Sequence, residues 1–397
     1  MNDNFSLDLE GIPKELKLIL EIIKIKNGQN LPLKIIEQIS DVNWNHFLEL
    51  AIHHRLYPLL YSKIKMIDQK ILPKFVVQTM FQEYKKNTFQ MLHLSAVMED
   101  VSKTFAENEM RLLVLKGPVL AADLYGDISR RTSRDLDILV QMNDLDKVDQ
   151  LLVTLGYKQE DYFQIETVLN DWKWRHHHIS YFHPKKGVKL EIHWRLNPGP
   201  GKEPSFNELW ERKRISSLTT HPVYYLGRED LFFFLVTHGA RHGWSRLRWL
   251  VDVHEIVRQK MDWIKILKVM REHQYLHLGG QVLILSSQLL ETPISEEMKA
   301  LILGKIPKDL AKKTIFYFEQ MVNLHTEPLP ESVSRYHDRY LLSLKTNRQK
   351  LLFYISVLYP SITDVKTIKL PKYLYVLYFP LRPFLLVMRK RWKQSLF

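Results

Sequence analysis

A block of strand and helix signals between residues 108 and 200 interrupts a chain whose other segments are patterned as helices. The short apolar run 111–115 predicts a buried strand, and a second run covers 135–140. Segments 177–182 and 188–193 predict two more strands, joined in a hairpin by a turn rich in proline, lysine and glycine. Strands and helices mixed within about one hundred residues predict a small α+β unit with a mixed sheet.

Apolar residues at helical spacing flank this block on both sides. They predict helices over segments such as 75–107 and 231–257. We therefore expect three regions, namely an N-terminal helical region (1–107), the α+β core (108–200) and a C-terminal helical region (201–397). The predicted fold class is α+β, with a small mixed sheet between helical flanks.

The composition excludes some kinds of site and favours some classes of partner. The chain has no cysteine, which excludes disulfides, thiolate metal sites and cysteine nucleophiles. Its 57 Lys and Arg against 44 Asp and Glu give a formal net charge of +13, which favours polyanionic partners such as nucleotides, nucleic acid or anionic lipid. The polar N-terminus does not resemble a secretory signal, and no segment has the ~20 mostly apolar residues that span a bilayer. We therefore expect a soluble, cytoplasmic protein.

Two aspartates mark the predicted strand 135–140. Asp135 and Asp137 are two positions apart, so their side chains point to the same face of the strand. Two adjacent carboxylates repel each other unless a cation lies between them, and Mg²⁺ prefers such oxygen ligands. Glu191, in the middle of strand 188–193, supplies a third carboxylate if the strands are neighbours. The alternative for an isolated Asp-x-Asp pair is a solvated, acidic face of the sheet.

A strand, a glycine turn and a helix precede this pair. Gly117 turns the chain, and Pro118 suits the first position of a helix. The N-terminus of a helix presents N–H donors and a positive dipole end to an anion, and the neighbouring Lys116 can reach a phosphate. An anion site beside three carboxylates is the arrangement that two-metal phosphoryl or nucleotidyl transfer requires.

Together these motifs resemble a bacterial nucleotidyltransferase family of the DNA polymerase β superfamily. The residues that carry the resemblance are Lys116-Gly117-x-x-Leu120-Ala121, Arg131-x-Ser133-x-Asp135-x-Asp137 and Leu190-Glu191-Ile192-His193-Trp194, with His53-His54-Arg55 upstream and His238-x-x-x-His242 to Asp252 downstream. The resemblance implies that Asp135, Asp137 and Glu191 are catalytic and hold two Mg²⁺ ions, with Mn²⁺ as a substitute. It also implies that Gly117 contacts the phosphates of the donor.

The activity implied by the resemblance is a biosynthetic transferase that moves a nucleotidyl group from ATP or another NTP to a hydroxyl or phosphate acceptor and releases pyrophosphate. Lys116, Arg131 and Ser133 are the further expected contacts to the donor. Family members commonly have serine or glycine after the turn glycine, where this chain has Pro118. This departure leaves open a nucleotide sugar as donor, with glycosyl transfer at the same metal centre. A non-catalytic nucleotide- or nucleic-acid-binding module is the alternative outside enzymes.

Two groups of histidines are further candidates. His238 and His242 are one turn apart on a predicted helix, and with Asp252 they are expected to line the nucleotide or acceptor cleft. A buried polar network is the alternative, while a zinc site would lack the glutamate of a His-Glu-x-x-His motif. In the triplet 176–178, strand alternation would bring at most His176 and His178 to one face, and we leave their role open.

The C-terminal tail, residues 361–397, combines eight basic residues, one acid and several interleaved aromatic residues. Such a segment suits contact with a membrane surface, or a terminal helix whose basic face lies in water. The sequence contains no known RNA- or DNA-binding motif, so nucleic acid is not favoured as a partner. The acceptor is left open among a small molecule, a glycan, a peptide and a protein.

Overall fold

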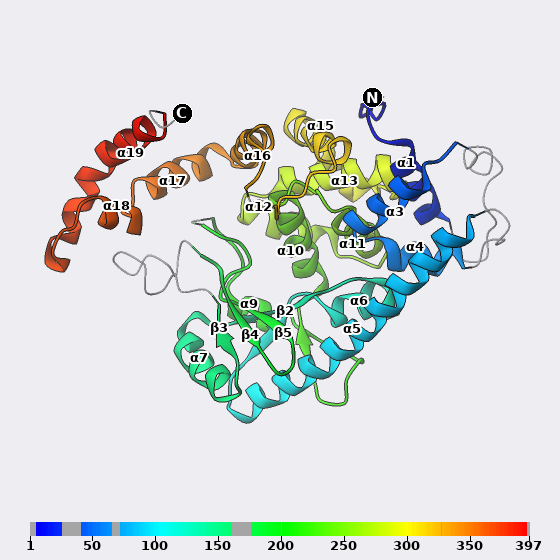
Figure 1. Cartoon of the computed structure of the whole chain (residues 1–397), viewed down its shortest axis with the longest axis horizontal. Coiled ribbons are helices and arrows are strands. Elements are labelled where there is room, and N and C mark those ends of the chain that lie inside the picture. The colour runs from blue at the N-terminus through cyan, green and yellow to red at the C-terminus, as the bar shows by residue number, and fades with distance from the viewer. Residues whose placement is uncertain are drawn as a thin grey trace.

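The computed structural model describes residues 5–25, 41–65, 72–160, 176–199, 201–326 and 328–394. Most helices form a broad cluster on one side of a smaller sheet, and the last helices extend away from the cluster as an arm (Figure 1). The N-terminal helices precede the sheet in sequence but lie beside helices that follow it. The α+β class with helical flanks is confirmed.

The sheet has seven strands in the order β3-β4-β5-β2-β1-β7-β6. The central strand β2 runs parallel to β5 and antiparallel to β1, and β4 and β5 form an antiparallel hairpin. The four longer strands lie within one residue of the segments that the sequence predicts. The strands are β1 (Leu112–Val114), β2 (Asp135–Val140), β3 (Lys158–Gln159), β4 (His178–His183), β5 (Val188–His193), β6 (Arg214–Ile215) and β7 (Tyr224–Tyr225).

Helices make up most of the rest of the described chain. They are α1 (Lys14–Lys24), α3 (Trp44–His53), α4 (Tyr57–Ile64), α5 (Lys74–Glu107), α6 (Pro118–Tyr125), α7 (Leu145–Thr154), α9 (Phe206–Glu211), α10 (Arg228–Arg241), α11 (Leu247–Val257), α12 (Trp263–Glu272), α13 (Leu276–Leu290), α14 (Glu296–Ile302), α15 (Lys305–Glu319), α16 (Glu331–Ser343), α17 (Asn347–Val357), α18 (Ile362–Thr367) and α19 (Tyr378–Gln394), with short 3-10 turns η1 (Ile128–Arg130), η2 (Met142–Asp144) and η3 (Lys372–Leu377).

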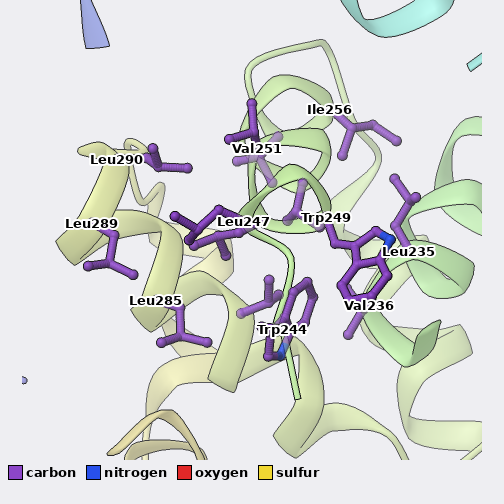
Figure 2. Close-up of a cluster of buried hydrophobic side chains, with 14 of the residues drawn as sticks. Leu235, Val236, Trp244, Leu247, Trp249, Val251, Ile256, Leu285, Leu289 and Leu290 are labelled. Atoms are coloured by element: carbon purple, nitrogen blue, oxygen red, sulfur yellow. The ribbon is translucent and has the colours of Figure 1, made fainter. Parts of the chain in front are cut away.

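Helices from both ends of the chain share one hydrophobic core. Ile19 of α1 and Leu60 of α4 are fully buried in the same cluster as Leu250 of α11. Figure 2 shows part of this core, where Trp244 and Leu247 face the leucines of α13. Each such side chain contributes about 1.5–3 kcal/mol when it is fully buried. The N-terminal helices are therefore held in place by the C-terminal ones.

The long helix α5 connects this core to a second one beneath the sheet. Val76 and Met80, near its start, are buried in the core of the helical cluster. Met91 and Leu94, farther along, are buried in the core that covers one face of the sheet. One helix therefore fixes the position of the sheet relative to the helical cluster (Figure 1).

The two faces of the sheet have different neighbours. Residues alternate between faces along a strand, so Ile138 and Leu139 on β2 point in opposite directions. Ile138 packs in the core with α5 and α7, whereas Leu139 belongs to the core of the helical cluster. Asp135 and Asp137 share the face of Leu139. Both acids therefore lie on the side of the sheet that faces the helical cluster.

The sequence predicts one continuous helix over 231–257, and the structure corrects this prediction to two helices, α10 and α11. Gly243 and Trp244, between them, both adopt left-handed backbone angles, with φ of +60° and 56°. A Cβ atom at Gly243 would lie 2.5 Å from the ring of Tyr317, so the close approach of that ring requires glycine. Residues before and after this turn therefore do not share a helix face.

Helices α16 to α19 continue from the cluster into the arm that ends at the C-terminus (Figure 1). Several of its apolar side chains are exposed, among them Leu351, Tyr373 and Phe384. None of the described helices has the length and the apolar character that crossing a membrane requires.

A buried histidine in the helical core makes stability sensitive to acid. His254 on α11 is buried, and its Nδ1 lies 2.7 Å from Thr292 Oγ1. Burial, together with the positive charges of Arg258 and Lys63, lowers the pKa of His254 to about 4. The unfolded chain, with a histidine pKa of about 6.5, binds this proton more readily. Stability is therefore expected to fall as the pH drops from about 6.5 towards 4.

Acidification from pH 7 to pH 5 is expected to remove about 2 kcal/mol of unfolding free energy through this one residue. His254→Gln should reduce the difference between the two pH values by that amount, as measured by urea unfolding. The exposed His93→Gln is the matched control and should leave the difference unchanged. An equal pH dependence in wild type and His254→Gln would contradict the assignment.

Candidate active site

The three predicted carboxylates come from two neighbouring strands. Asp135 and Asp137 lie on β2, and Glu191 lies on β5, directly opposite Asp137 in the parallel register. Asp137 is fully buried, while Asp135 and Glu191 are partly exposed. Side-chain oxygens of Asp137 and Glu191 lie within 4.8 Å of each other, and the negative charges of both act on Asp135. The structure therefore gathers the three acids on the face that points to the helical cluster.

The glycine turn lies beside these acids. Gly117 has a φ of +84°, which an L side chain rarely adopts, and a Cβ atom there would contact Leu136 at 3.4 Å. Pro118 is the first residue of α6, as the sequence predicts. Lys116, just before the turn, places its Nζ 2.8 Å from Asp137 Oδ1. The turn thus brings the N-terminus of α6 and one ammonium group next to the carboxylates.

Ser133 lies on the same side of the acids as this turn. Its hydroxyl donates a hydrogen bond of 3.1 Å to the carbonyl of Asp135. Its Oγ is also 4.0 Å from the position that a Cβ atom of Gly117 would occupy. A hydroxyl group therefore stands beside the turn although Pro118 follows the glycine.

His193 belongs to this cluster, although the sequence analysis did not single it out. Its Nε2 lies 3.3 Å from Asp137 Oδ1 and 3.6 Å from Glu191 Oε2. Burial lowers the pKa of His193, but the two carboxylates outweigh this effect and raise it overall. Burial likewise raises the pKa of Asp137, but Lys116 and His193 hold it far below its usual range. The signal in the sequence was the two-residue spacing from Glu191, which puts both side chains on one face.

Asp135 differs from Asp137 in its environment. Burial and the charge of Asp137 raise the pKa of Asp135, and Lys116 only partly opposes this shift. Two arginines near Asp135 were not selected as site residues from the sequence. Arg55 is close enough to interact electrostatically with Asp135, and Arg134 is close enough to interact with Arg55. Neither guanidinium forms a hydrogen bond or an ion pair within the described part of the chain. These two cations are available to an anionic ligand.

The histidine triplet is placed differently from the prediction. The sequence predicts that at most His176 and His178 converge, but His177 and His178 both approach His193, with ligand atoms within 4.8 Å of one another. His177 precedes β4, which begins at His178, so strand alternation does not constrain it. Arg241 Nη1 lies 3.0 Å from His177 Nε2. The triplet thus connects the carboxylates to α10.

His238 lies in the last turn of α10, and His242 directly follows the helix as its C-terminal cap. Their rings are 4.7 Å apart, and each packs against Trp249 of α11. Burial and then nearby positive charges, including that of Lys116, lower the pKa of both well below its usual value. Both imidazoles are therefore neutral near pH 7, and their expected role in lining a cleft stays a prediction.

Arg131 and Asp252 bind each other rather than a carboxylate of the cluster. The Nε and Nη2 atoms of Arg131 each donate a hydrogen bond of 2.9 Å to one oxygen of Asp252. Tyr125 donates a third bond of 2.7 Å to the same carboxylate. Both partners of the ion pair are almost completely buried. The pair joins α11 to the segment that leads into β2.

The cluster fits a divalent metal ion. Asp137 Oδ2 is buried and has no hydrogen-bond partner among the described residues. Asp137, Glu191 and His193 have ligand atoms within 4.8 Å of one another, and Asp135 lies close enough for the charges of both acids to act on it. Carboxylate oxygens are the hard ligands that Mg²⁺ and Mn²⁺ favour. A site of this composition, with a helix N-terminus and free cations beside it, has the parts needed to bind a polyphosphate and promote transfer from it.

Comparison with known proteins gives two findings. Residues 40–291, more than half of the chain, match the model of a family described as an uncharacterised nucleotidyltransferase. The chain is also similar to a crystal structure of an antigenic nucleotidyltransferase-like protein from Paracoccidioides brasiliensis, with 14% identity, a TM-score of 0.30, and coverage of 51% of this chain and 94% of that one. No curated protein matches the sequence.

Proposed function

The chain belongs to this family of uncharacterised nucleotidyltransferases, as its sequence motifs predicted, and from that membership we propose a specific reaction. The protein transfers a nucleotidyl group from a nucleoside triphosphate to a hydroxyl or phosphate group of an acceptor, with Mg²⁺, and releases pyrophosphate. The observation that carries the proposal is the register of β2 and β5, which places Asp137 opposite Glu191, while Lys116, after β1, contacts Asp137 from the other side.

The donor phosphates would bind on the β1 side of the carboxylates. Gly117 leaves room for a phosphate to approach the backbone, and the N-terminus of α6 presents N–H donors to it. Lys116 supplies a charge beside Asp137. Arg55 and Arg134 supply two further charges that form no ion pair with a described carboxylate. We assign Arg131 and Asp252 to the scaffold, because they bind each other.

In the proposed reaction, the acceptor oxygen forms a bond to the α-phosphorus of the donor. The bond from that phosphorus to the bridging oxygen breaks, and pyrophosphate leaves with the electron pair. The proton of an acceptor hydroxyl passes to Glu191. Burial raises the pKa of Glu191, but the contact with His193 lowers it overall, so this carboxylate is ionised and can accept the proton. The metal ion, when bound, neutralises phosphate charge and activates the attacking oxygen.

A thermal-shift panel of NTPs and nucleotide sugars, with and without Mg²⁺, tests the donor. A ligand that binds only the folded state raises the melting temperature, so an NTP with Mg²⁺ is expected to do so. Lys116→Gln should weaken NTP binding about tenfold, because a charged hydrogen bond to phosphate is lost, and should shrink this rise. Lys186→Gln, on the β4–β5 turn, is the matched control and should keep the full rise.

The mass of the modified acceptor then separates the two donor classes. Nucleotidyl transfer adds a nucleoside monophosphate to the acceptor and yields pyrophosphate. A rise in melting temperature with nucleotide sugars alone, followed by a sugar-sized mass gain, would show that the proposed reaction is wrong and that the glycosyl alternative holds.

A further inference from the structure

A cavity of about 470 Å³ lies between the sheet and the C-terminal helices. One wall is the segment after β5, which includes Asn197 and Gly201, and the others come from α10, α13, α16 and α17. Its volume is within the range of small-molecule sites. The cavity is lined by His176, Asn197, Pro198, Gly199, Gly201, Thr237, Arg241, Tyr275, Leu278, Leu341, Leu344, Lys345, Gln349, Leu352, Phe353 and Ser356.

The lining combines apolar side chains with two positive charges, and the ammonium of Lys345 lies 5.3 Å from the ring centroid of Phe353. Leu341, Leu352 and Phe353 belong to the apolar wall on α16 and α17, whereas Arg241 and Lys345 bring two positive charges. None of the lining residues within the described part of the chain is acidic. Among the described residues, neither cation forms an ion pair with a carboxylate, and the buried Nε of Arg241 has no hydrogen-bond partner. Partly buried cations that form no ion pair favour an anionic ligand, although the charges of Glu191 and Glu203 also act on Arg241.

Arg241 connects this cavity to the carboxylate cluster. Its Nη1 contacts His177, whose ring centroid lies 5.4 Å from that of His193, and His193 contacts Asp137 and Glu191. The histidines come from β4 and β5, which lie on one side of β2 in the sheet, whereas Lys116 follows β1 on the other side. The cavity and the glycine turn therefore approach the acids from opposite sides.

We propose that this cavity binds the acceptor, and that the acceptor is a small molecule with an oxyanion group, a phosphate or a carboxylate, on an apolar or ring-shaped body. Arg241 and Lys345 bind the oxyanion, and the leucines of α16 and α17 contact the body. The assignment of this ligand as the acceptor rests on the proposed nucleotidyl transfer, in which the donor occupies the opposite side of the carboxylates. The binding chemistry itself does not depend on that reaction.

Titration calorimetry with phenyl phosphate, without donor or metal, tests the proposal. Phenyl phosphate combines one oxyanion with a ring, and benzyl alcohol is its neutral counterpart. Wild type should bind phenyl phosphate and not benzyl alcohol. Lys345→Gln and Arg241→Gln should each weaken binding about tenfold, since each removes a charged hydrogen bond. Leu352→Trp, at the partly exposed cavity wall, should block binding by filling the space.

The control for Lys345 is Arg348→Gln, an exposed residue of α17 outside the cavity, and it should bind like wild type. Lys116→Gln should also bind like wild type, which excludes the glycine turn as the site. Absence of binding in wild type, or equal affinity in wild type, Lys345→Gln and Leu352→Trp, would overturn the proposal. Asp137→Asn should keep phenyl phosphate binding while it loses transfer. The proposed binding cavity and the proposed reaction can therefore be disproved independently of each other.

Discussion

Asp137→Asn is expected to reduce nucleotidyl transfer by about 10³-fold or more, because it removes the central negative charge of the proposed metal site. Asp137 is fully buried on β2 between Lys116 and His193, and it lies opposite Glu191. Charge stabilisation by a bound metal contributes several kcal/mol to transfer reactions, and about 4 kcal/mol corresponds to a factor of 10³. The measurement is pyrophosphate release from an NTP with Mg²⁺ and the acceptor found by the mass assay.

The shape of asparagine matches that of aspartate, so the substitution tests charge more than packing. Glu160→Gln is the matched control, because Glu160 pairs with Lys189 at a partly exposed position on the edge of the same sheet. It should keep wild-type turnover. Circular dichroism and the melting temperature would establish that both variants are folded. Wild-type turnover in folded Asp137→Asn would remove Asp137 from the catalytic set.

The local parts of this site could be predicted from the sequence. The strand 135–140 has the same bounds in the structure, since its apolar alternation and flanking polar residues are local signals. The turn at Gly117 and the helix start at Pro118 are also local, because glycine permits the positive φ and proline suits the first helical position. The same-face position of Asp135 and Asp137 follows from the period of a strand alone.

The partners of these residues could not be predicted in the same way. Pairing of β2 with β5 joins segments about fifty residues apart, and no local pattern sets its register. Arg55, His177 and Arg241 reach the site from three separate parts of the chain, and only the packing of the helical cluster on the sheet brings them there. His193 is an exception, because residues two positions apart on a strand share a face, and Glu191 therefore indicates His193 as its neighbour.

The turn between α10 and α11 shows how tertiary contacts override a helical pattern. The apolar spacing over 231–257 is continuous, yet Gly243 and Trp244 break it with left-handed backbone angles. The ring of Tyr317, from α15, occupies the space beside Gly243. The sequence pattern contains no information about that ring, so the break had no local signal beyond one glycine.

Asp252→Asn is expected to lower the free energy of unfolding by about 3–5 kcal/mol, which would make it the most destabilising variant considered. Asp252 is fully buried and receives two hydrogen bonds from Arg131 and one from Tyr125. Without the carboxylate, the guanidinium of Arg131 stays buried and loses its ion-pair partner. Urea unfolding at pH 7 measures the loss. Asp41→Asn is the control, because its ion pair with Lys14 is exposed and should contribute less than about 1 kcal/mol.

The double variant Arg131→Met/Asp252→Leu separates the cost of an unpaired charge from the contribution of the pair itself. Replacing a buried ion pair by apolar side chains of similar volume is often neutral or stabilising, so the double variant should recover most of the loss seen in Asp252→Asn. The pair joins α11 to the segment before β2, so its replacement can shift Asp135 even if the double variant is as stable as wild type. If the double variant is as stable as wild type but transfers more slowly, the pair positions the carboxylates. A loss below 1 kcal/mol in Asp252→Asn would instead show that Arg131 reaches solvent and that the pair is not structurally important.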